Sequence, residues 1–281
     1  MVFPVASLPS PPSPIMFEAG PFALRYYGLC IALGIVVATW IAGRELVRKG
    51  YDGELALDSL FFIVPPGFVG ARAYHVITDY DLYADDPWPG VVAVWNGGLG
   101  IYGGVVGGFL GLLVFARVRN ISPLAFADAV APGLVLAQAI GRWGNYFNQE
   151  LYGRVTDLPS AVHIDPEYRV DPAVATYHPT FLYESVWNVG LAAVCVWADR
   201  RFRMGYGQVF ALYVALYCAG RAWIEALRVD EATTLFRLRL NEYVSILLLL
   251  GALAYLVRTR NRRGDRSRLA DPRAAEETLA A

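Results

Sequence analysis

Seven long apolar stretches, separated by short polar segments, organise the chain. Each approaches the roughly 20 residues that a helix needs to cross the hydrocarbon core of a bilayer. The second stretch is the weakest, because Pro65 and Pro66 interrupt it, although proline is tolerated in a membrane helix whose neighbours satisfy the freed backbone groups. We therefore expect an all-α, polytopic membrane protein with about seven transmembrane helices. The expected spans are residues 23–43, 57–78, 99–116, 123–141, 180–198, 207–226 and 241–257.

The remaining residues define the expected organisation of the chain. Residues 1–22 are rich in Pro and Ser and carry no basic residue, so they lack the charged start of a signal peptide and are expected to form an extracytoplasmic segment. Residues 23–257 form the transmembrane domain. Its one sizeable insertion, 150–178, is expected to be a small extracytoplasmic cap. The Arg-rich tail, 258–281, is expected to be disordered and cytoplasmic.

The distribution of basic residues predicts the orientation. Basic residues follow the first, third and fifth spans, and seven arginines lie in the tail, whereas the first loop on the opposite side is acidic. The positive-inside rule then places the carboxyl terminus in the cytoplasm and the amino terminus outside. The polar segment 141–153 consequently faces outward.

Composition narrows the class of protein. Of 281 residues, 56% are hydrophobic, which excludes a disordered chain and is high for a soluble enzyme. The net charge of −1 is uninformative, because the charges are segregated along the chain. The three cysteines lie in apolar stretches and are interpreted as small buried side chains. The three histidines lack metal-ligand spacing. We expect no metal, no nucleotide cofactor and no nucleic-acid partner.

The third span is unusually rich in glycine. Two ladders with four-residue steps interleave there. Small residues at this spacing let helices approach closely, which is the structural interpretation. The functional alternative is that the missing side chains leave a slot for an acyl chain, and both can hold together. The ladders are Gly100, Gly104 and Gly108, and Gly103, Gly107 and Gly111.

A polar stripe in the sixth span carries charges into the membrane. Tyr217, Arg221, Glu225 and Arg228 fall within an arc of about 80° on one helix face. A charge at mid-helix costs about 2.5–3.5 kcal/mol on insertion scales. Arg221 and Glu225 either offset each other within the helix or belong to a polar cavity wall. The length of the stripe favours the cavity wall.

Two further stripes have the same helical spacing. Thr180, Glu184 and Asn188 form one, which is either a capped helix with a single buried carboxylate or a second cavity wall. Gln138, Arg142 and Asn145 form the other. In the second span, Arg72 needs a partner, for which Glu184, Glu225 and Asp128 are candidates.

The most informative segment, residues 141–153, reads GRWGNYFNQELYG and directly follows an apolar run. It gathers a cation, two amides and a carboxylate between glycines: Arg142, Asn145, Asn148 and Glu150, closed by Gly153. Arginine binds phosphate bidentately and does not deprotonate. Several arginines within one membrane bundle therefore point to an anionic lipid headgroup as ligand.

Residues 141–153 closely resemble the signature of the prolipoprotein diacylglyceryl transferase family. The resemblance covers about residues 20–257. Other elements that are similar to the family pattern are Tyr26-Tyr27-Gly28, Gly70-Ala71-Arg72, Trp95-Asn96-Gly97-Gly98, Tyr102-Gly103-Gly104, the segment from His178 to Glu184, and the segment from Tyr217 to Arg228.

The resemblance implies a seven-helix transferase of the bacterial cytoplasmic membrane whose site opens toward the outer leaflet. Such enzymes move the diacylglyceryl group of phosphatidylglycerol to the lipobox cysteine of a preprolipoprotein and release glycerol 1-phosphate. This is the first step of bacterial lipoprotein maturation. The partners implied are phosphatidylglycerol, lipobox signal peptides and the bilayer. One departure matters: the family often has His at the position of Tyr102, and a neutral tyrosine, with a pKa near 10, is a poor base at pH 7.

Site roles follow from this resemblance and from the chemistry of the residues. Arg142 and Arg221 are expected to stabilise the phosphate as its second charge develops. Asn145, Asn148 and Tyr27 are expected to orient headgroup oxygens. Glu150 either anchors the loop or receives the thiol proton. Glu225 is expected to fix Arg221, and the remaining substrate-binding candidates are Arg72, Gly153, His178, Glu184, Tyr217 and Arg228, with Tyr102 kept among the catalytic candidates.

Three other classes of protein compete with this interpretation. A transporter or flippase predicts internal symmetry and paired broken helices, neither of which is clear in the sequence. A metal-dependent phosphotransferase predicts a clustered Asp-rich motif, which is absent from the sequence. A structural scaffold does not account for the number of intramembrane charges.

Overall fold

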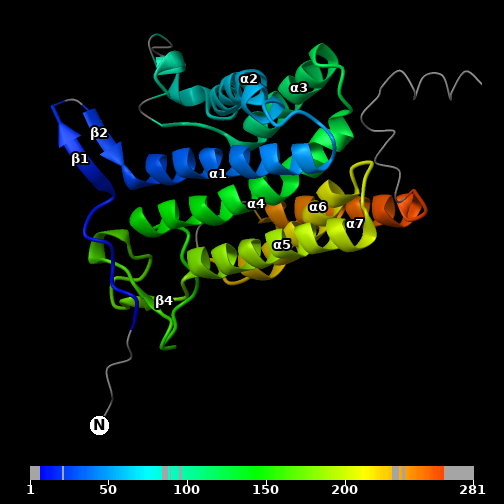
Figure 1. The fold of residues 1–281 in the computed structure, drawn as a ribbon. Helices are drawn as coiled ribbons and strands as arrows, with labels where there is room; N and C mark the ends of the chain where they lie inside the picture. Colours follow the sequence, from blue (N-terminus) through cyan, green and yellow to red (C-terminus); the bar gives the residue numbers. More distant parts are fainter. Residues whose placement is uncertain are drawn as a thin grey trace, which may run out of the picture. The chain divides into compact units, whose positions relative to one another are not determined.

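The computed structural model describes residues 7–20, 22–83, 88, 90–94, 97–229, 234–235 and 238–262. Seven long helices dominate the described residues, with three short antiparallel strand pairs between or before them (Figure 1). The strand pairs are β1 (Ile15–Ala19) with β2 (Phe22–Arg25), β3 (Val162–His163) with β4 (Thr176–Tyr177), and β5 (Thr234–Leu235) with β6 (Leu238–Arg239). The helices are α1 (Tyr26–Arg48), α2 (Leu55–Thr78), α3 (Ile101–Val118), α4 (Pro123–Phe147), α5 (Thr180–Phe202), α6 (Gln208–Glu225) and α7 (Leu240–Thr259), joined by 3-10 turns that include η1 (Tyr80–Leu82), η2 (Gly90–Val92) and η4 (Pro166–Tyr168).

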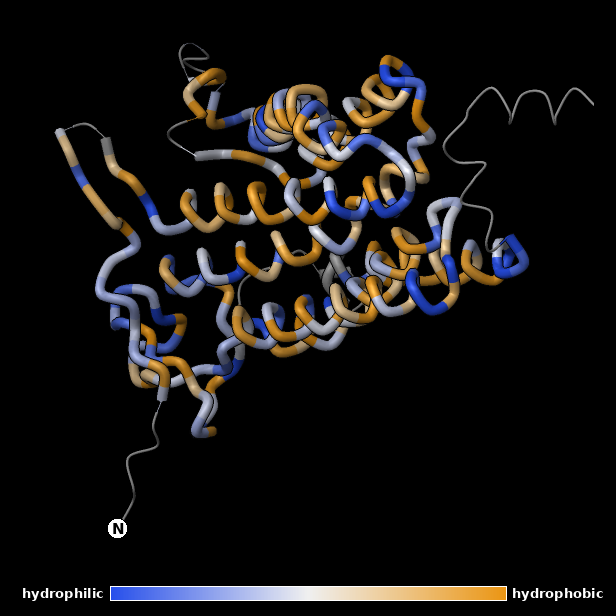
Figure 2. The backbone as a smooth tube through the Cα atoms, in the orientation of Figure 1, coloured by the Kyte–Doolittle hydropathy of each residue, from blue (hydrophilic) through white to orange (hydrophobic). Residues whose placement is uncertain are grey.

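The all-α, polytopic membrane class is confirmed. Six helices are long and apolar enough to cross a membrane, and Figure 2 shows their predominantly hydrophobic colouring. Helix α6 is outside that set; it is the helix that carries Arg221 and Glu225. The helix α2 continues through Pro65 and Pro66.

Several helix boundaries differ from the predicted spans: α1, α4 and α5 continue to Arg48, Phe147 and Phe202, beyond the expected ends at residues 43, 141 and 198. Helix α1 begins at Tyr26 because the preceding residues form β2. Helix α4 continues past residue 141 to Phe147, so that Arg142 and Asn145 lie within it. Of the quoted family elements, Trp95 and Asn96 lie outside the described residues, as do residues 1–6 and the tail from residue 263 onward.

The described residues fall into two compact units. The first comprises residues from 1–42 and 127–264, and the second comprises 43–126. The first unit has a core between α4, α5 and α6, in which Val135, Cys195 and Val209 are fully buried. Asp128 of α4 caps the start of α6: its carboxylate oxygens accept hydrogen bonds from the backbone N–H groups of Gly207 at 2.8 Å and Phe210 at 3.0 Å. These bonds satisfy amide donors that a helix start leaves free.

A small cap with its own core follows α4 in the first unit. Tyr152, Val162 and Tyr177 are buried there, and Phe181 at the start of α5 packs against them. The amino-terminal segment joins this cap, because Leu8 pairs with Val162 in a parallel bridge.

Hydrogen bonds to Asp165 also stabilise the same cap. Gln149 donates to a carboxylate oxygen of Asp165 at 2.7 Å and accepts from the Asp165 backbone N–H at 2.7 Å. Ser10 donates to the other carboxylate oxygen at 2.8 Å. The hydrogen bond from Gln149, followed by that from Ser10, lowers the pKa of Asp165 from its ordinary value.

Glycines hold α2 and α3 together in the second unit. Gly103, Gly107 and Gly111 are buried on α3. A Cβ atom added at Gly107 would lie 2.8 Å from the Pro66 carbonyl carbon and 3.2 Å from the Gly67 Cα atom. Close helix packing therefore explains this ladder, and the backbone of α2 occupies the space that an acyl chain would need.

Candidate functional site

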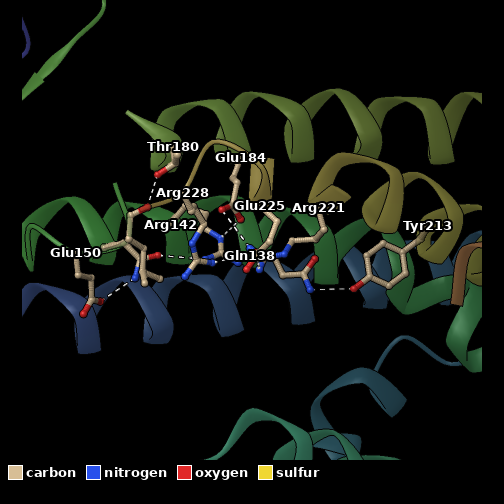
Figure 3. Close-up of polar contacts among 11 residues, drawn as sticks. Gln138, Arg142, Glu150, Thr180, Glu184, Tyr213, Arg221, Glu225 and Arg228 are labelled. Carbon is tan, nitrogen blue, oxygen red and sulfur yellow. Dashed lines mark hydrogen bonds and ion pairs between the residues drawn. The ribbon is translucent and has the colours of Figure 1, made fainter. Parts of the chain in front are cut away.

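Five charged side chains form one connected network in the first unit (Figure 3). Arg142 on α4 forms an ion pair with Glu184 on α5, with Nε and Oε2 separated by 2.6 Å. Arg221 on α6 contacts the other oxygen of the same carboxylate at 3.4 Å. Arg221 also pairs with Glu225, whose Oε2 lies 3.4 Å from Nη1 of Arg228. We refer to these five residues as the charged network.

Side chains of the charged network are buried, which strengthens the electrostatic effect of their charges. The side chains of Glu184 and Glu225 are 5% and 2% exposed, and that of Arg228 is 8% exposed. Three guanidinium groups and two carboxylates leave one net positive charge. A net charge in a low-dielectric interior attracts an anion more strongly than the same charge in water. The network therefore offers a place for a singly negative group.

The network is more than a pair within one helix. The ion pair between Arg221 and Glu225 within α6, which was one of the two interpretations of this stripe, is present. However, Glu184 links Arg221 to Arg142 on another helix, and Tyr217 on α6 is near enough to Arg142 to interact with it electrostatically. The stripes predicted on α4, α5 and α6 therefore meet.

An amide branch extends from the network toward the surface. Arg142 donates to the Asn145 side-chain oxygen at 3.3 Å. The Asn145 and Asn148 amides both donate to one oxygen of Glu150, at 2.8 Å and 3.2 Å. Glu150 is exposed and thus lies at the outer end of this branch. Holding two amides is an anchoring arrangement, which favours the first of the two roles considered for Glu150.

Two residues next to this branch have steric roles. The Tyr27 ring lies so close to Gly144 that an added Cβ atom would approach its Cδ2 atom to 2.5 Å. At Gly153, a Cβ atom would lie 2.8 Å from the Cβ atom of His178, and the Gly153 N–H donates to the His178 carbonyl at 2.9 Å. Gly153 and His178 thus connect the signature segment to the start of α5.

Polar contacts between α4 and α6 continue one helical turn before Arg142. Gln138 on α4 donates to the hydroxyl of Tyr213 on α6 at 2.9 Å (Figure 3). Within the described residues, Oε1 of Gln138 and Nδ2 of Asn188 have no hydrogen-bond partner. Sequence reasoning missed Tyr213, although it lies four residues before Tyr217 on the same helix face.

Two predicted site residues belong to the second unit. Arg72 donates to the carbonyls of Gly90 at 2.6 Å and of Val91, Gly97 and Gly98 at 2.8 Å. Its hydrogen bonds therefore go to loop carbonyls instead of the carboxylates that we expected as partners. Tyr102 on α3 is 38% exposed, and its ring centroid lies 5.8 Å from that of Tyr74.

A cavity of about 470 Å³ opens beside the amide branch. Asn148 and Glu150 line it, together with Arg25 and with Tyr168 of the cap.

The comparisons with known proteins agree with one another. A family model described as prolipoprotein diacylglyceryl transferase matches residues 14–258. Phosphatidylglycerol–prolipoprotein diacylglyceryl transferase 1 of Streptomyces coelicolor is 48% identical over 271 residues, which are 95% of this chain and 78% of the relative. The enzymes named phosphatidylglycerol–prolipoprotein diacylglyceryl transferase from Frankia alni and Corynebacterium glutamicum are 52% and 46% identical, over 92% and 90% of this chain and 68% and 83% of their own lengths. On the extent of this match, the chain belongs to the prolipoprotein diacylglyceryl transferase family.

Proposed function

We propose that this protein transfers the diacylglyceryl group of phosphatidylglycerol to the lipobox cysteine thiol of a preprolipoprotein, and that the charged network is the reaction site. Family membership and the names of the relatives support the reaction. One structural observation carries the site: Arg142 and Arg221, from different helices, contact the two oxygens of the same buried carboxylate of Glu184. Two guanidinium groups are thereby held in one place.

The charge of the network matches the chemistry of the donor. A phosphodiester carries one negative charge, equal and opposite to the net charge of the network. When the bond between the glycerol carbon and the phosphate oxygen breaks, the departing phosphate monoester gains a second negative charge. Contacts that strengthen as this charge develops stabilise the transition state more than the ground state. Arg142 and Arg221 have this role in the proposal.

The reaction balances without a cofactor. The substrate thiol releases its proton, which passes finally to the solvent, and the sulfur electron pair forms the new thioether bond to the glycerol carbon. The electrons of the broken carbon–oxygen bond leave with the phosphate as glycerol 1-phosphate. Free thiols have a pKa near 8.5, so a small fraction is thiolate at neutral pH, and nearby guanidinium charge increases that fraction.

The remaining predicted residues position these groups. Asn145 and Asn148, held by Glu150, orient headgroup oxygens, and Tyr27 lies near enough to Arg142 and Glu150 to interact electrostatically with both. Glu225 fixes Arg221. The catalytic assignment of Tyr102 stays a prediction, as do the substrate-binding assignments of Arg72, Gly153, His178, Glu184, Tyr217 and Arg228.

The proposed location is the bacterial cytoplasmic membrane, with the amino terminus outside and the carboxyl terminus in the cytoplasm. The distribution of basic residues supports this orientation. In it, the charged network lies toward the outer leaflet, where exported peptides arrive.

Reconstituted protein with phosphatidylglycerol and a lipobox peptide tests this function. Arg142→Ala should lower the rate of thioether formation about 10²–10³-fold, because it removes a contact to the developing charge. Arg117→Ala, an exposed change at the end of α3, is the matched control and should leave the rate unchanged. Full activity of Arg142→Ala would refute the phosphate role. Lipid movement without release of glycerol phosphate would indicate transport instead.

A further inference from the structure

A second, apolar cavity of about 750 Å³ lies in the first unit, away from the charged network. Side chains from three helices line it, among them Ile41 of α1, Leu136 of α4 and Val189 of α5. Arg200 and Arg201, near the end of α5, also line it. It is therefore an apolar groove that two arginine side chains also line.

The length of this groove matches one leaflet of a bilayer. Val189 and Arg200 both line the groove on α5. At about 1.5 Å of rise per residue, the helix covers roughly 16 Å between them. Half of a hydrocarbon core about 30 Å thick is about 15 Å. An acyl chain that follows α5 from the groove arginines would thus extend to the middle of the membrane.

Among the described residues, no carboxylate forms an ion pair with the arginines of the groove, Arg200 and Arg201, whereas Arg119 and Arg48 pair with Asp58 and Glu45. Both groove arginines are exposed. Trp197, one turn before Arg201, also lines the groove and is 58% exposed, which is typical of an aromatic residue at a membrane–water interface. Basic pockets between membrane helices on the cytoplasmic side bind anionic headgroups.

We propose that this groove binds one anionic diacyl phospholipid of the cytoplasmic leaflet as a structural ligand. Its phosphate contacts Arg200 and Arg201, and an acyl chain lies along Val196 and Val189. The site is separate from the reaction site, because Glu184 lies at the other end of α5, about 24 Å from Arg200 along the helix. The leaflet assigned here rests on the proposed orientation, but binding does not depend on the proposed reaction.

Native mass spectrometry of the purified full-length protein tests the headgroup contact. The protein is freed of lipid in an uncharged detergent and then given phosphatidylglycerol or phosphatidylcholine with the same acyl chains. Arg200→Gln/Arg201→Gln should retain one phosphatidylglycerol fewer than the unaltered protein and lose part of the extra thermal stabilisation that this lipid gives over phosphatidylcholine. Arg258→Gln/Arg260→Gln, an exposed pair at the end of α7, is the matched control and should lose neither.

Ala193→Trp tests the groove without changing charge. Ala193 lines the cavity and is exposed, so the larger side chain fills the groove without entering the core. This variant should lose the same bound lipid although both arginines remain. Retention of that lipid by either variant would overturn the proposal. Equal stabilisation by free glycerol phosphate that is lost in Arg200→Gln/Arg201→Gln would also overturn it, because the groove would then bind a soluble anion.

Activity separates this inference from the proposed function. With saturating phosphatidylglycerol and lipobox peptide, Arg200→Gln/Arg201→Gln should keep its rate of thioether formation to within about threefold at a temperature where it is folded. A loss of transfer activity with full lipid retention would contradict a structural lipid site. Absence of transfer activity in the unaltered protein would refute the proposed function and leave the lipid count as an independent result.

Discussion

Glu184 is the residue on which the arrangement of the charged network depends. Its carboxylate is buried and contacts guanidinium groups from two other helices, one at each oxygen. Removing one partner of a buried ion pair costs about 3–5 kcal/mol, because the remaining charge stays buried without compensation. Glu184 therefore orients both arginines and lowers the free energy of burying them.

The variant Glu184→Gln distinguishes an effect on the orientation of the two arginines from an effect on binding of the anionic donor. It raises the net charge of the network from one to two positive charges, so binding of the anionic donor should not weaken. The two arginines lose the negative charge that they share, so kcat should fall about 10²-fold while KM stays constant or falls. Steady-state kinetics on phosphatidylglycerol vesicles measure both constants. Glu167→Gln, exposed on the cap, should leave both unchanged, and a raised KM with normal kcat in Glu184→Gln would contradict this role.

Among the helices, the pairing of α2 with α3 depends on the absence of side chains. At Gly107, backbone atoms of α2 occupy the position of a Cβ atom, and backbone cannot move aside as a flexible side chain can. At Gly251 on α7, by contrast, no atom lies within 4 Å of the position of an added Cβ atom. The same substitution should therefore have opposite effects on the two helices.

Gly107→Ala should destabilise the protein by about 1–3 kcal/mol, the usual cost of overpacking. Gly251→Ala should have no cost or should stabilise by up to about 1 kcal/mol, because alanine favours a helix. Thermal unfolding in detergent, followed by tryptophan fluorescence, compares the two variants. Equal midpoints would show that α2 and α3 do not require this close approach.

Sequence periodicity predicted the helices better than it predicted their contacts. The stripes containing Arg142, Glu184 and Arg221 follow from helical spacing. Their convergence does not, because no periodicity states which helices are neighbours. We expected carboxylates as the partners of Arg72, because a pattern of charged residues in a sequence reveals only charged partners. Backbone carbonyls satisfy Arg72 instead, and every residue carries one. The end of α4 was placed too early, because Arg142 and Asn145 look like surface residues until their partners are known.

At the scale of the whole molecule, Asp165 connects three distant segments: the amino-terminal segment through Ser10, the signature segment through Gln149, and the cap to which it belongs. Its pKa is lowered in the folded protein, mainly by the hydrogen bond from Gln149. A lowered folded pKa contributes stability above the ordinary value, and that stability is lost as the pH falls through the folded pKa.

Asp165→Asn should consequently unfold at a lower temperature than the unaltered protein at pH 7. The difference should shrink as the pH falls below about 4, where the unaltered carboxylate also takes up a proton. Unfolding midpoints between pH 3 and pH 7 measure this, at roughly half-unit steps. Asp157→Asn, at an exposed acidic position of the cap, is the control. A difference independent of pH would show that the charge of Asp165 is not involved.

The bonds from Asp128 to the start of α6 have a consequence for biosynthesis. Asp128 precedes Phe210, one of its two amide partners, by 82 residues. The ribosome therefore synthesises Asp128 long before the two backbone N–H groups that donate to its carboxylate. Until α6 emerges, the hydrogen bonds from Gly207 and Phe210 to this carboxylate cannot form. A nascent chain stopped before Gly207 cannot finish this junction, so completion of the bundle waits for the later helix.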